Sequence, residues 1–274
     1  MNMKEKIMII GGDKRNYYLT KELFYKGYNA VWYACENFGS NREEFVSSSL
    51  CLKDIENFHV LVLPLPLTKD SVHISTPYSD QKIKISEICQ RGKGKLIFSS
   101  EFAVGNSVNY FSAKDVVVAN ARLTALGLLK EMLIHTETDI MNKSVMVTGF
   151  GNVGKAVAKI LNDNGMRVTV CARNKEQRAT AESCGLMAYS IDEGRENISS
   201  FDFVVNTVPF ELFSSETVKK AKENCVFFEL AKGLPKETCS SHCAYIMCKG
   251  MPGKHVSESA GKVIADFICE QLEA

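Results

Sequence analysis

The sequence has almost no net charge, no long apolar run and no internal repeat. Its 274 residues include 33 Lys and Arg against 32 Asp and Glu. No overall field therefore draws the chain to nucleic acid or to a membrane surface, and any anionic ligand must be held by local groups. No apolar stretch approaches the length of a membrane-spanning helix. We expect a globular protein that binds neither nucleic acid nor membrane.

A secretory signal is also missing, which bears on the cysteines. Only residues 7–10 are continuously apolar before Gly11-Gly12, and so short a run fits a first strand rather than a signal peptide. Ten cysteines are scattered from Cys35 to Cys269. Without a signal, we expect reduced, buried thiols and a cytoplasmic protein rather than a disulfide framework.

Four potential zinc ligands lie near the C-terminal end, namely Cys239, His242, Cys243 and Cys248. Their spacing matches no standard set of paired zinc ligands. Residues 245–248 instead alternate as a strand with every second side chain buried. We therefore expect no metal site.

The most informative stretch lies between residues 143 and 165. A short apolar strand is followed by Gly149-Phe150-Gly151-Asn152-Val153-Gly154, then by an amphipathic helix and a second strand at 167–171. Three glycines between strand and helix form the dinucleotide-binding fingerprint. Gly149 permits the tight turn, Gly151 leaves room for a pyrophosphate, and Gly154 lets the helix pack against the strand. The helix N–H groups would then face the phosphates. The alternative is a Rossmann unit whose site is empty.

Strands alternate with helices along the whole chain, which predicts an α/β fold of two Rossmann-like lobes with parallel sheets, joined by long interdomain helices. The strands are expected at residues 6–10, 29–34, 59–63, 95–98, 116–118, 145–148, 167–171, 203–205, 226–230 and 245–247. Helices are expected to end near residue 26 and to cover residues 81–90, 123–135 and 257–272.

The expected domains are an N-terminal Rossmann-like substrate or partner domain at 1–120, an interdomain helix at 121–142, an NAD(P)-binding domain at 143–256, and a helix at 257–274 that returns to the first lobe. The first turn, GGDKRN, lacks the third glycine of the fingerprint, so this lobe is not expected to grip a nucleotide. Two such lobes form a cleft, and ligands bind at the carboxyl ends of parallel strands.

The residues after the second strand of the fingerprint unit indicate which dinucleotide is bound. In NAD-binding units this strand ends in an acid that bonds the ribose hydroxyls. Here it is followed by Ala172-Arg173-Asn174, and the next acid is Glu176. No carboxylate would repel a 2′-phosphate, and the guanidinium of Arg173 could clamp one. We predict NADP, with NAD possible; the alternative is a solvated arginine.

Several segments occur in the same order in a known family. They are Ile9-Ile10-Gly11-Gly12-Asp13-x-Arg15, Thr124-Ala125-x-Gly127, His135-Thr136, Asn206-Thr207-Val208-Pro209, Met251-Pro252-Gly253 and Ser259-Ala260-Gly261. On these the chain resembles the A subunits of dipicolinate synthase over its whole length, and more distantly the D-2-hydroxyacid dehydrogenase superfamily. It departs from the family at Leu126, Asn152-Val153, 232–235 and 254–257.

The resemblance implies the last step of dipicolinic acid formation in the mother cell of a sporulating bacterium. Dihydrodipicolinate, or its hydrated precursor, would lose a hydride to NAD(P) and a proton to a base, giving an aromatic pyridine dicarboxylate. Cations and helix N-termini would hold the two carboxylates. The flavoprotein-like B subunit of dipicolinate synthase is the implied partner, and we expect a homo-oligomer.

Candidate site residues follow from the loops at the strand ends. The catalytic candidates are Lys232 and His255, the second as a proton relay. The substrate-binding candidates are Gly12, Asp13, Arg15, Arg122, Thr124, Pro252, Gly253 and Lys254. The cofactor-binding candidates are Gly149, Gly151, Asn152, Val153, Gly154, Ala172, Arg173, Asn174, Asn206, Thr207, Val208, Pro209 and Ala231. Asp13 could instead cap a helix, and Arg15 could be a surface residue. Lys254 and His255 are expected to follow a turn at Pro252-Gly253. His135 is expected to be structural.

Two other functions remain open. A D-2-hydroxyacid dehydrogenase needs an arginine for the carboxylate and a histidine with a supporting acid. Lys232 stands near the place of that arginine, and no acid obviously serves His255. The third possibility is a non-catalytic dinucleotide-binding subunit that positions or regulates its partner.

Overall fold

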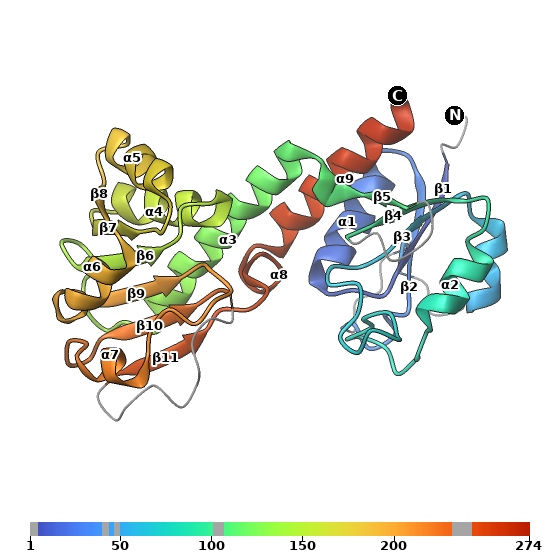
Figure 1. The fold of residues 1–274 in the computed structure, drawn as a ribbon. Helices are drawn as coiled ribbons and strands as arrows, with labels where there is room; N and C mark the ends of the chain where they lie inside the picture. Colours follow the sequence, from blue (N-terminus) through green and yellow to red (C-terminus); the bar gives the residue numbers. More distant parts are fainter. Residues whose placement is uncertain (1–4, 40–43, 47–49, 101–106, 232–242) are drawn as a thin grey trace. The chain divides into compact units, whose positions relative to one another are not determined.

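The computed structural model describes residues 5–39, 44–46, 50–100, 107–231 and 243–274. The chain divides into two compact units, Met1–Asn120 with Val256–Ala274, and Ala121–His255. Each unit contains one parallel sheet (Figure 1). The predicted α/β class with two Rossmann-like regions is confirmed. No helix in the described part of the chain is both long enough and apolar enough to cross a membrane.

The first unit contains a five-stranded sheet with the order β2-β1-β3-β4-β5. Its strands are β1 (Lys6–Ile10), β2 (Asn29–Tyr33), β3 (Val60–Val62), β4 (Leu96–Ser99) and β5 (Val108–Asn109). Its helices are α1 (Lys14–Tyr25), η1 (Leu52–Asn57), α2 (Ile85–Arg91), η2 (Tyr110–Ser112) and α9 (Ser257–Glu273). Helices α1 and α9 lie side by side (Figure 1). A Cβ atom at Gly261 of α9 would stand 2.5 Å from the carbonyl oxygen of Arg15, so only glycine permits this approach.

The second unit contains a six-stranded sheet with the order β11-β10-β9-β6-β7-β8, the arrangement of a doubly wound nucleotide-binding fold. Its strands are β6 (Ser144–Thr148), β7 (Arg167–Cys171), β8 (Met187–Tyr189), β9 (Phe203–Asn206), β10 (Val226–Glu229) and β11 (Ala244–Met247). Its helical elements are α4 (Asn152–Asp163), α5 (Lys175–Ser183), α6 (Ile191–Glu196), η3 (Ile198–Ser200), α7 (Ser215–Lys219) and α8 (Met251–His255). Helix α3 (Lys114–Ile134) begins in the first unit and continues into the second.

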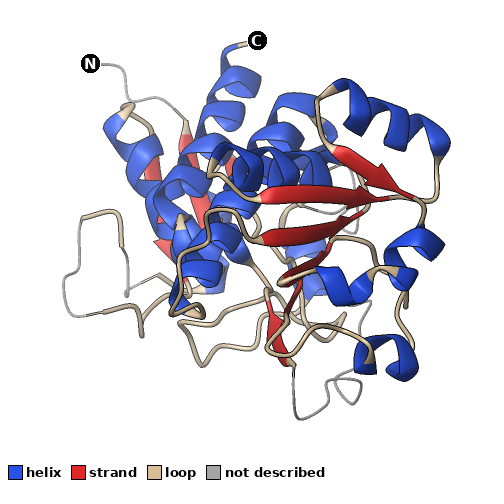
Figure 2. Ribbon diagram, turned by 90° about the vertical axis from the view of Figure 1, so that its left-hand side faces the viewer, coloured by secondary structure: helices blue, strands red, loops and turns tan. Residues whose placement is uncertain are grey.

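Apolar residues on both faces of this second sheet explain its place in the core. Val145 and Val147 of β6 lie on one face and Met146 on the other, and all three are fully buried, as parallel strands covered on both sides require. Val157 and Leu161 of α4 recur four residues apart and pack in the same cluster. Figure 2 shows the resulting alternation of red strands and blue helices.

Three sequence-based expectations need correction. Residues 116–118 were expected as a strand but belong to α3, and the helix expected from residue 81 begins only at Ile85. The β-branched run at 116–118 favours a strand locally. However, it is followed by good helix formers without a glycine or proline up to Gly127, and this longer context prevails. The turn expected at Pro252-Gly253 is part of the short helix α8. Strands β5 and β8 were not predicted.

Candidate functional site

In the glycine turn between β6 and α4, Gly149 and Gly154 lie too close to neighbouring atoms to carry a side chain, whereas Gly151 faces open space. Gly149 has a φ of +81°, and a Cβ atom there would stand 2.6 Å from Cγ1 of Val208. A Cβ atom at Gly154 would stand 2.3 Å from the carbonyl oxygen of Gly149. At Gly151, by contrast, a Cβ atom would meet no described atom within 4 Å beyond its chain neighbours. Space therefore remains where a diphosphate would approach the turn.

The start of α4 adds free donors to this space. Its N-cap is Gly151, which has no side chain to bond the first-turn N–H groups, and the first turn carries no acidic residue among the described positions. Helix N-terminal N–H groups without a capping side chain favour an anion. Asn152 and Val153 belong to this first turn. The residues present therefore fit the diphosphate of a dinucleotide.

The segment after β7 is fixed by an arginine other than the predicted one. Arg178 Nη1 donates to the carbonyl oxygens of Ala172 and Arg173, at 2.7 and 2.9 Å. Asn174 caps α5 with its side chain. Arg173 is exposed, and its guanidinium lies over the ring of Phe210, 5.1 Å from the centroid. Arg173 is thus presented at the carboxyl edge of the sheet, while Arg178 has a structural task.

A buried acid on α3 organises the residues that follow β11. Glu131 is 1% exposed. Its carboxylate pairs with Lys254 Nζ, lies 3.0 Å from His255 Nε2, and lies 3.4 Å from His135 Nε2. Burial raises the pKa of Glu131, but the hydrogen bonds and charges of Lys254 and His255 outweigh burial and lower it overall. Lys130 Nζ also donates to the carbonyl oxygen of His255, at 3.1 Å.

Glu131 is the functional candidate that the sequence analysis missed. The expectation that no acid serves His255 is wrong, because the acid lies 124 positions away in the sequence. Two signals could have found it. One is the single acid within the apolar segment 123–134, and the other is the spacing of four residues between Glu131 and His135.

The first turn of the first unit forms an internal ion pair. Asp13 caps α1 by accepting from the Arg15 backbone N–H. It also accepts from Arg15 Nε at 2.8 Å and from Nη2 at 2.7 Å. Arg15 is 5% exposed, so a substrate carboxylate at this position would have to compete with Asp13. The N–H of Gly12 donates to the carbonyl oxygen of Ser75 at 2.8 Å, so this donor is not offered to a phosphate.

The remaining candidates are spread over several elements. Arg122 is exposed and Thr124 half-buried, both on α3, whereas Pro252 is buried in α8. Lys232 lies outside the described residues. The structure therefore brings together the glycine turn with Thr207 and Val208, and separately Lys254 and His255 with Glu131.

The cysteines and histidines near the C-terminal end form no metal centre in the described part of the chain. Cys239 and His242 lie outside the described residues. Cys248 is a free, buried thiol, and burial first, then the charge of Glu131, raise its pKa to about 12. A thiol with so high a pKa is unreactive at neutral pH.

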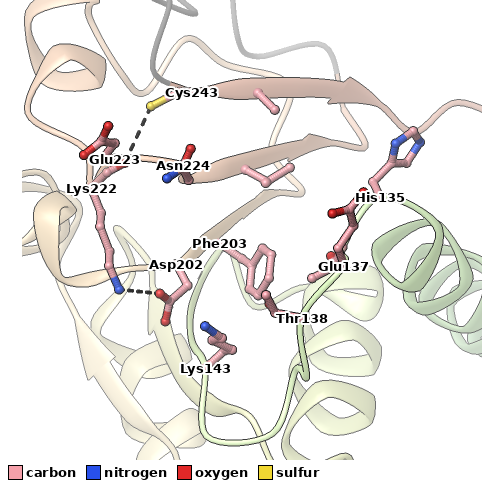
Figure 3. A pocket seen from close by; sticks show the side chains of 13 residues that line it. His135, Glu137, Thr138, Lys143, Asp202, Phe203, Lys222, Glu223, Asn224 and Cys243 are labelled. Atoms are coloured by element: carbon pink, nitrogen blue, oxygen red, sulfur yellow. Dashed lines mark hydrogen bonds and ion pairs between the residues drawn. The ribbon is translucent and has the colours of Figure 1, made fainter.

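A cavity of about 730 Å³ lies at the amino edge of the same sheet, opposite the glycine turn (Figure 3). It is lined by residues at the starts of β9, β10 and β11, among them Phe203, Val226 and Ala244. Lys222 and Asp202 form an ion pair across its wall. The cavity is also lined by His135, Thr136 and Cys243, which the sequence analysis singled out, and by none of the predicted cofactor residues.

Comparison with known proteins matches both parts of the chain. Residues 6–103 match the family described as the N-terminal domain of the dipicolinate synthase A subunit, and residues 112–235 match the D-isomer specific 2-hydroxyacid dehydrogenase, NAD binding domain. The A subunit of dipicolinate synthase from Bacillus subtilis (strain 168) is 21% identical over 284 residues, covering 97% of this chain and 95% of that protein.

Two further relatives extend the picture. The crystal structure of the dipicolinate synthase A subunit from Bacillus halodurans superposes with a TM-score of 0.83 at 20% identity, covering 98% of this chain and 97% of that one. Shikimate dehydrogenase (NADP(+)) of Hyphomonas neptunium is 28% identical over 100 residues, which is 35% of this chain and 37% of that protein. The chain therefore resembles the dipicolinate synthase A subunit over nearly its whole length, with one region that matches the N-terminal domain of that family and a second that matches an NAD-binding dehydrogenase domain.

Proposed function

We propose that this chain is the oxidoreductase subunit that forms dipicolinate from dihydrodipicolinate or its hydrated precursor. The observation that carries the proposal is the pairing of His255 with the buried carboxylate of Glu131, in the same unit as a glycine turn that is open at Gly151. The first arrangement suits a proton acceptor, and the second suits a dinucleotide. The identity of the substrate is inferred from the resemblance to the dipicolinate synthase A subunit.

The reaction removes two hydrogens from the ring of dihydrodipicolinate, and the hydrated precursor must first lose water to give that ring. When bound, the nicotinamide dinucleotide accepts one hydrogen with its electron pair as a hydride. The other hydrogen leaves as a proton, and the ring becomes an aromatic pyridine dicarboxylate. We assign the proton to His255. Its Nε2 faces Glu131, whereas Nδ1 has no partner among the described residues. A carboxylate behind the ring stabilises the imidazolium that forms when Nδ1 takes the proton.

Lys254 complements His255 in this assignment. Its side chain is 55% exposed although its ammonium pairs with the nearly inaccessible Glu131. An exposed cation beside the proton acceptor suits one carboxylate of a dicarboxylate substrate. Lys232, which we propose as a second cation or acid, lies outside the described residues. Arg15 is the least favoured because its side chain is 6% exposed as well as paired with Asp13, whereas Lys254 is exposed.

We propose NADP as the preferred dinucleotide. Arg173 is exposed directly after β7, where the ribose of the adenosine lies in this fold, and the neighbouring described positions bear no carboxylate until Glu176. The contact of Arg173 with the ring of Phe210 keeps the guanidinium at the surface and does not neutralise its positive charge. Titration of the Arg173→Ala variant with both dinucleotides tests this, since only the NADP affinity should fall.

A partner chain follows from the resemblance to one subunit of a synthase, and we propose that the partner is the flavoprotein-like B subunit. We also propose a homo-oligomer. Mixing the purified chains and measuring the mass of the complex by light scattering tests both proposals. A monodisperse monomer at working concentration, with and without the B subunit, would contradict them.

The deciding experiment uses the full chain, with and without the B subunit, in the presence of the dihydro intermediate and either dinucleotide. We expect ultraviolet absorbance of the pyridine product to rise together with that of the reduced nicotinamide. The His255→Asn variant should bind the dinucleotide like the wild type and lose turnover by about a hundredfold or more. If the wild type binds the dinucleotide but yields no product in any combination, the chain is a non-catalytic dinucleotide-binding subunit.

One observation keeps the D-2-hydroxyacid dehydrogenase reaction as a second candidate. That chemistry requires a histidine supported by an acid, and His255 has such an acid in Glu131. Reduction of small 2-keto acids by the reduced dinucleotide tests it. Turnover of a 2-keto acid without any on the dihydro intermediate would favour this candidate over dipicolinate formation.

A further inference from the structure

Three adjacent strands of the second unit end in polar residues that are fully buried. Thr148 of β6, Asn206 of β9 and Glu229 of β10 are each 0% exposed. They lie in one register row, because Asn206 pairs with Thr148 on one side and with Glu229 on the other. Register partners on parallel strands present their side chains on the same face of the sheet. The row lies at the carboxyl edge, where the glycine turn begins.

The row forms one hydrogen-bonded chain. Thr148 Oγ1 donates to Asn206 Oδ1 at 2.6 Å. Asn206 Nδ2 donates to both carboxylate oxygens of Glu229, at 3.0 Å each. The Ala231 N–H donates to Glu229 Oε1 at 2.7 Å. Among the described residues, Glu229 thus has amide donors and no cation. A buried carboxylate without a cation is costly, so its retention here calls for an explanation.

The loop after β9 depends on this row. Asn206 accepts from the Val208 N–H at 3.2 Å and donates to the Val208 carbonyl oxygen at 3.0 Å. Thr207 Oγ1 donates to the Thr148 carbonyl oxygen at 2.6 Å. The amide of Asn206 can adopt this orientation only if its Nδ2 faces an acceptor, and Glu229 supplies that acceptor.

The same loop lies against the glycine turn. The Cβ position of Gly149 is 2.6 Å from Val208 Cγ1 and 3.1 Å from Thr207 Oγ1, and that of Gly154 is 3.3 Å from Thr207 Oγ1. Side chains at Gly149 and Gly154 would collide with this loop, so the loop packs directly against the backbone of the turn, and the bond from Thr207 Oγ1 to the Thr148 carbonyl oxygen ties the two together. The chain of contacts therefore runs from Glu229 through Asn206 to the wall of the diphosphate cradle.

We propose that Glu229 is a positioning residue for the dinucleotide: as a buried acceptor it fixes the amide of Asn206, and through it the Thr207–Val208 wall that holds the glycine turn open. This inference rests on the proposed dinucleotide site and adds a residue to it. Glu229 does not touch the diphosphate, and it acts only through the loop after β9.

The test is the Glu229→Gln variant of the full chain, titrated with reduced dinucleotide and followed by nicotinamide fluorescence without substrate. The glutamine keeps the size but turns an amide donor toward Asn206 Nδ2. One unpaired buried donor costs enough free energy to weaken binding about tenfold when the loss falls on the bound form. Turnover at saturating dinucleotide should change far less than the dissociation constant.

The matched control is Asp202→Asn in the same unit. Asp202 is also a largely buried acid, it accepts from the Ser144 backbone N–H at 2.8 Å, and it lies at the opposite edge of the sheet. This variant should lose thermal stability and keep the dissociation constant. If Glu229→Gln loses stability with an unchanged dissociation constant, or if both variants weaken binding equally, the proposal is overturned. If the wild type binds neither dinucleotide, the proposed site itself fails.

Discussion

Replacement of Glu131 by glutamine is the sharpest test of the His255 cluster. The change keeps the shape of the side chain but removes its charge, and it leaves one oxygen to serve the donors of Lys254 and His255. A hydrogen bond to a charged group contributes about 1.5 to 3 kcal/mol. Lys254 is 55% exposed and can return to water, so most of its share is recovered. We expect the variant to lose about 2 to 3 kcal/mol of unfolding free energy.

The pH dependence of that loss has a defined sign. The pKa of Glu131 is lowered in the folded chain, because the bonds from Lys254 and His255 outweigh the effect of burial. A lowered folded pKa means that the stabilisation is complete above the unfolded value, which is about 4.3 for a glutamate. It is then lost as the pH falls through the folded pKa. The difference between wild type and Glu131→Gln in urea unfolding should therefore persist at neutral pH and shrink below about pH 4.

The catalytic readout is independent of stability. Without the charge of Glu131, an imidazolium at His255 loses its partner, so turnover should fall by about a hundredfold at a temperature where both proteins are folded. The dinucleotide dissociation constant should not change. Glu137→Gln, at an exposed position just beyond α3, is the control and should match the wild type. If Glu131→Gln turns over like the wild type, the cluster has no part in proton transfer.

Three further substitutions test the geometry elsewhere. Gly151→Ala should leave the melting temperature unchanged, because its Cβ meets open space, and weaken dinucleotide binding about tenfold in a fluorescence titration. Gly261→Ala should cost about 1 to 3 kcal/mol in urea unfolding, because its Cβ would stand 2.5 Å from the Arg15 carbonyl oxygen; an unchanged midpoint would refute the close packing of α1 and α9. Burial raises the pKa of Asp202, but the bonds from Lys222 and the chain at β6 lower it to about 2. Asp202→Asn should therefore lose about 2 kcal/mol at neutral pH, and the difference from wild type should vanish between about pH 4 and pH 2.

The fold could be predicted because its strongest signals are local. The glycine turn follows a strand and opens a helix within a short stretch, so its conformation is largely written in neighbouring residues. The error at residues 116–118 has the opposite cause. Those residues favour a strand by themselves, and only their continuation into α3 makes them helical. The conformational preference of the residues themselves determines a short, isolated element. Where such a segment is continuous with a longer element, the longer element determines its conformation.

The site was harder to predict because its partners are distant in the sequence. His255 could be selected as a titratable group after a strand. Its acid, Glu131, lies on α3, and the apolar residues around Glu131 made this helix look like a simple connector between the two lobes. The row of Thr148, Asn206 and Glu229 likewise depends on the pairing of strands that sequence periodicity cannot align. Residue types gave the candidates, and only the register of the sheet and the packing of α3 bring them together.

Glu131 and Glu229 are both buried near the carboxyl edge of one sheet, yet their surroundings suit them to different work. Glu131 faces a lysine and two histidines, so its charge is balanced by groups that can themselves exchange protons. Among the described residues, Glu229 faces amide donors and no cation, and such donors hold a fixed geometry and transfer no proton. When two acids of one unit differ in this way, the environment assigns the roles. Removing the charge of Glu131 should therefore reduce turnover at constant dinucleotide affinity, whereas Glu229→Gln should reduce affinity with turnover nearly preserved. Measured side by side, Glu131→Gln should change the turnover number and Glu229→Gln the dissociation constant of the dinucleotide. If both variants change the same constant, neither environment has the specific effect proposed for it.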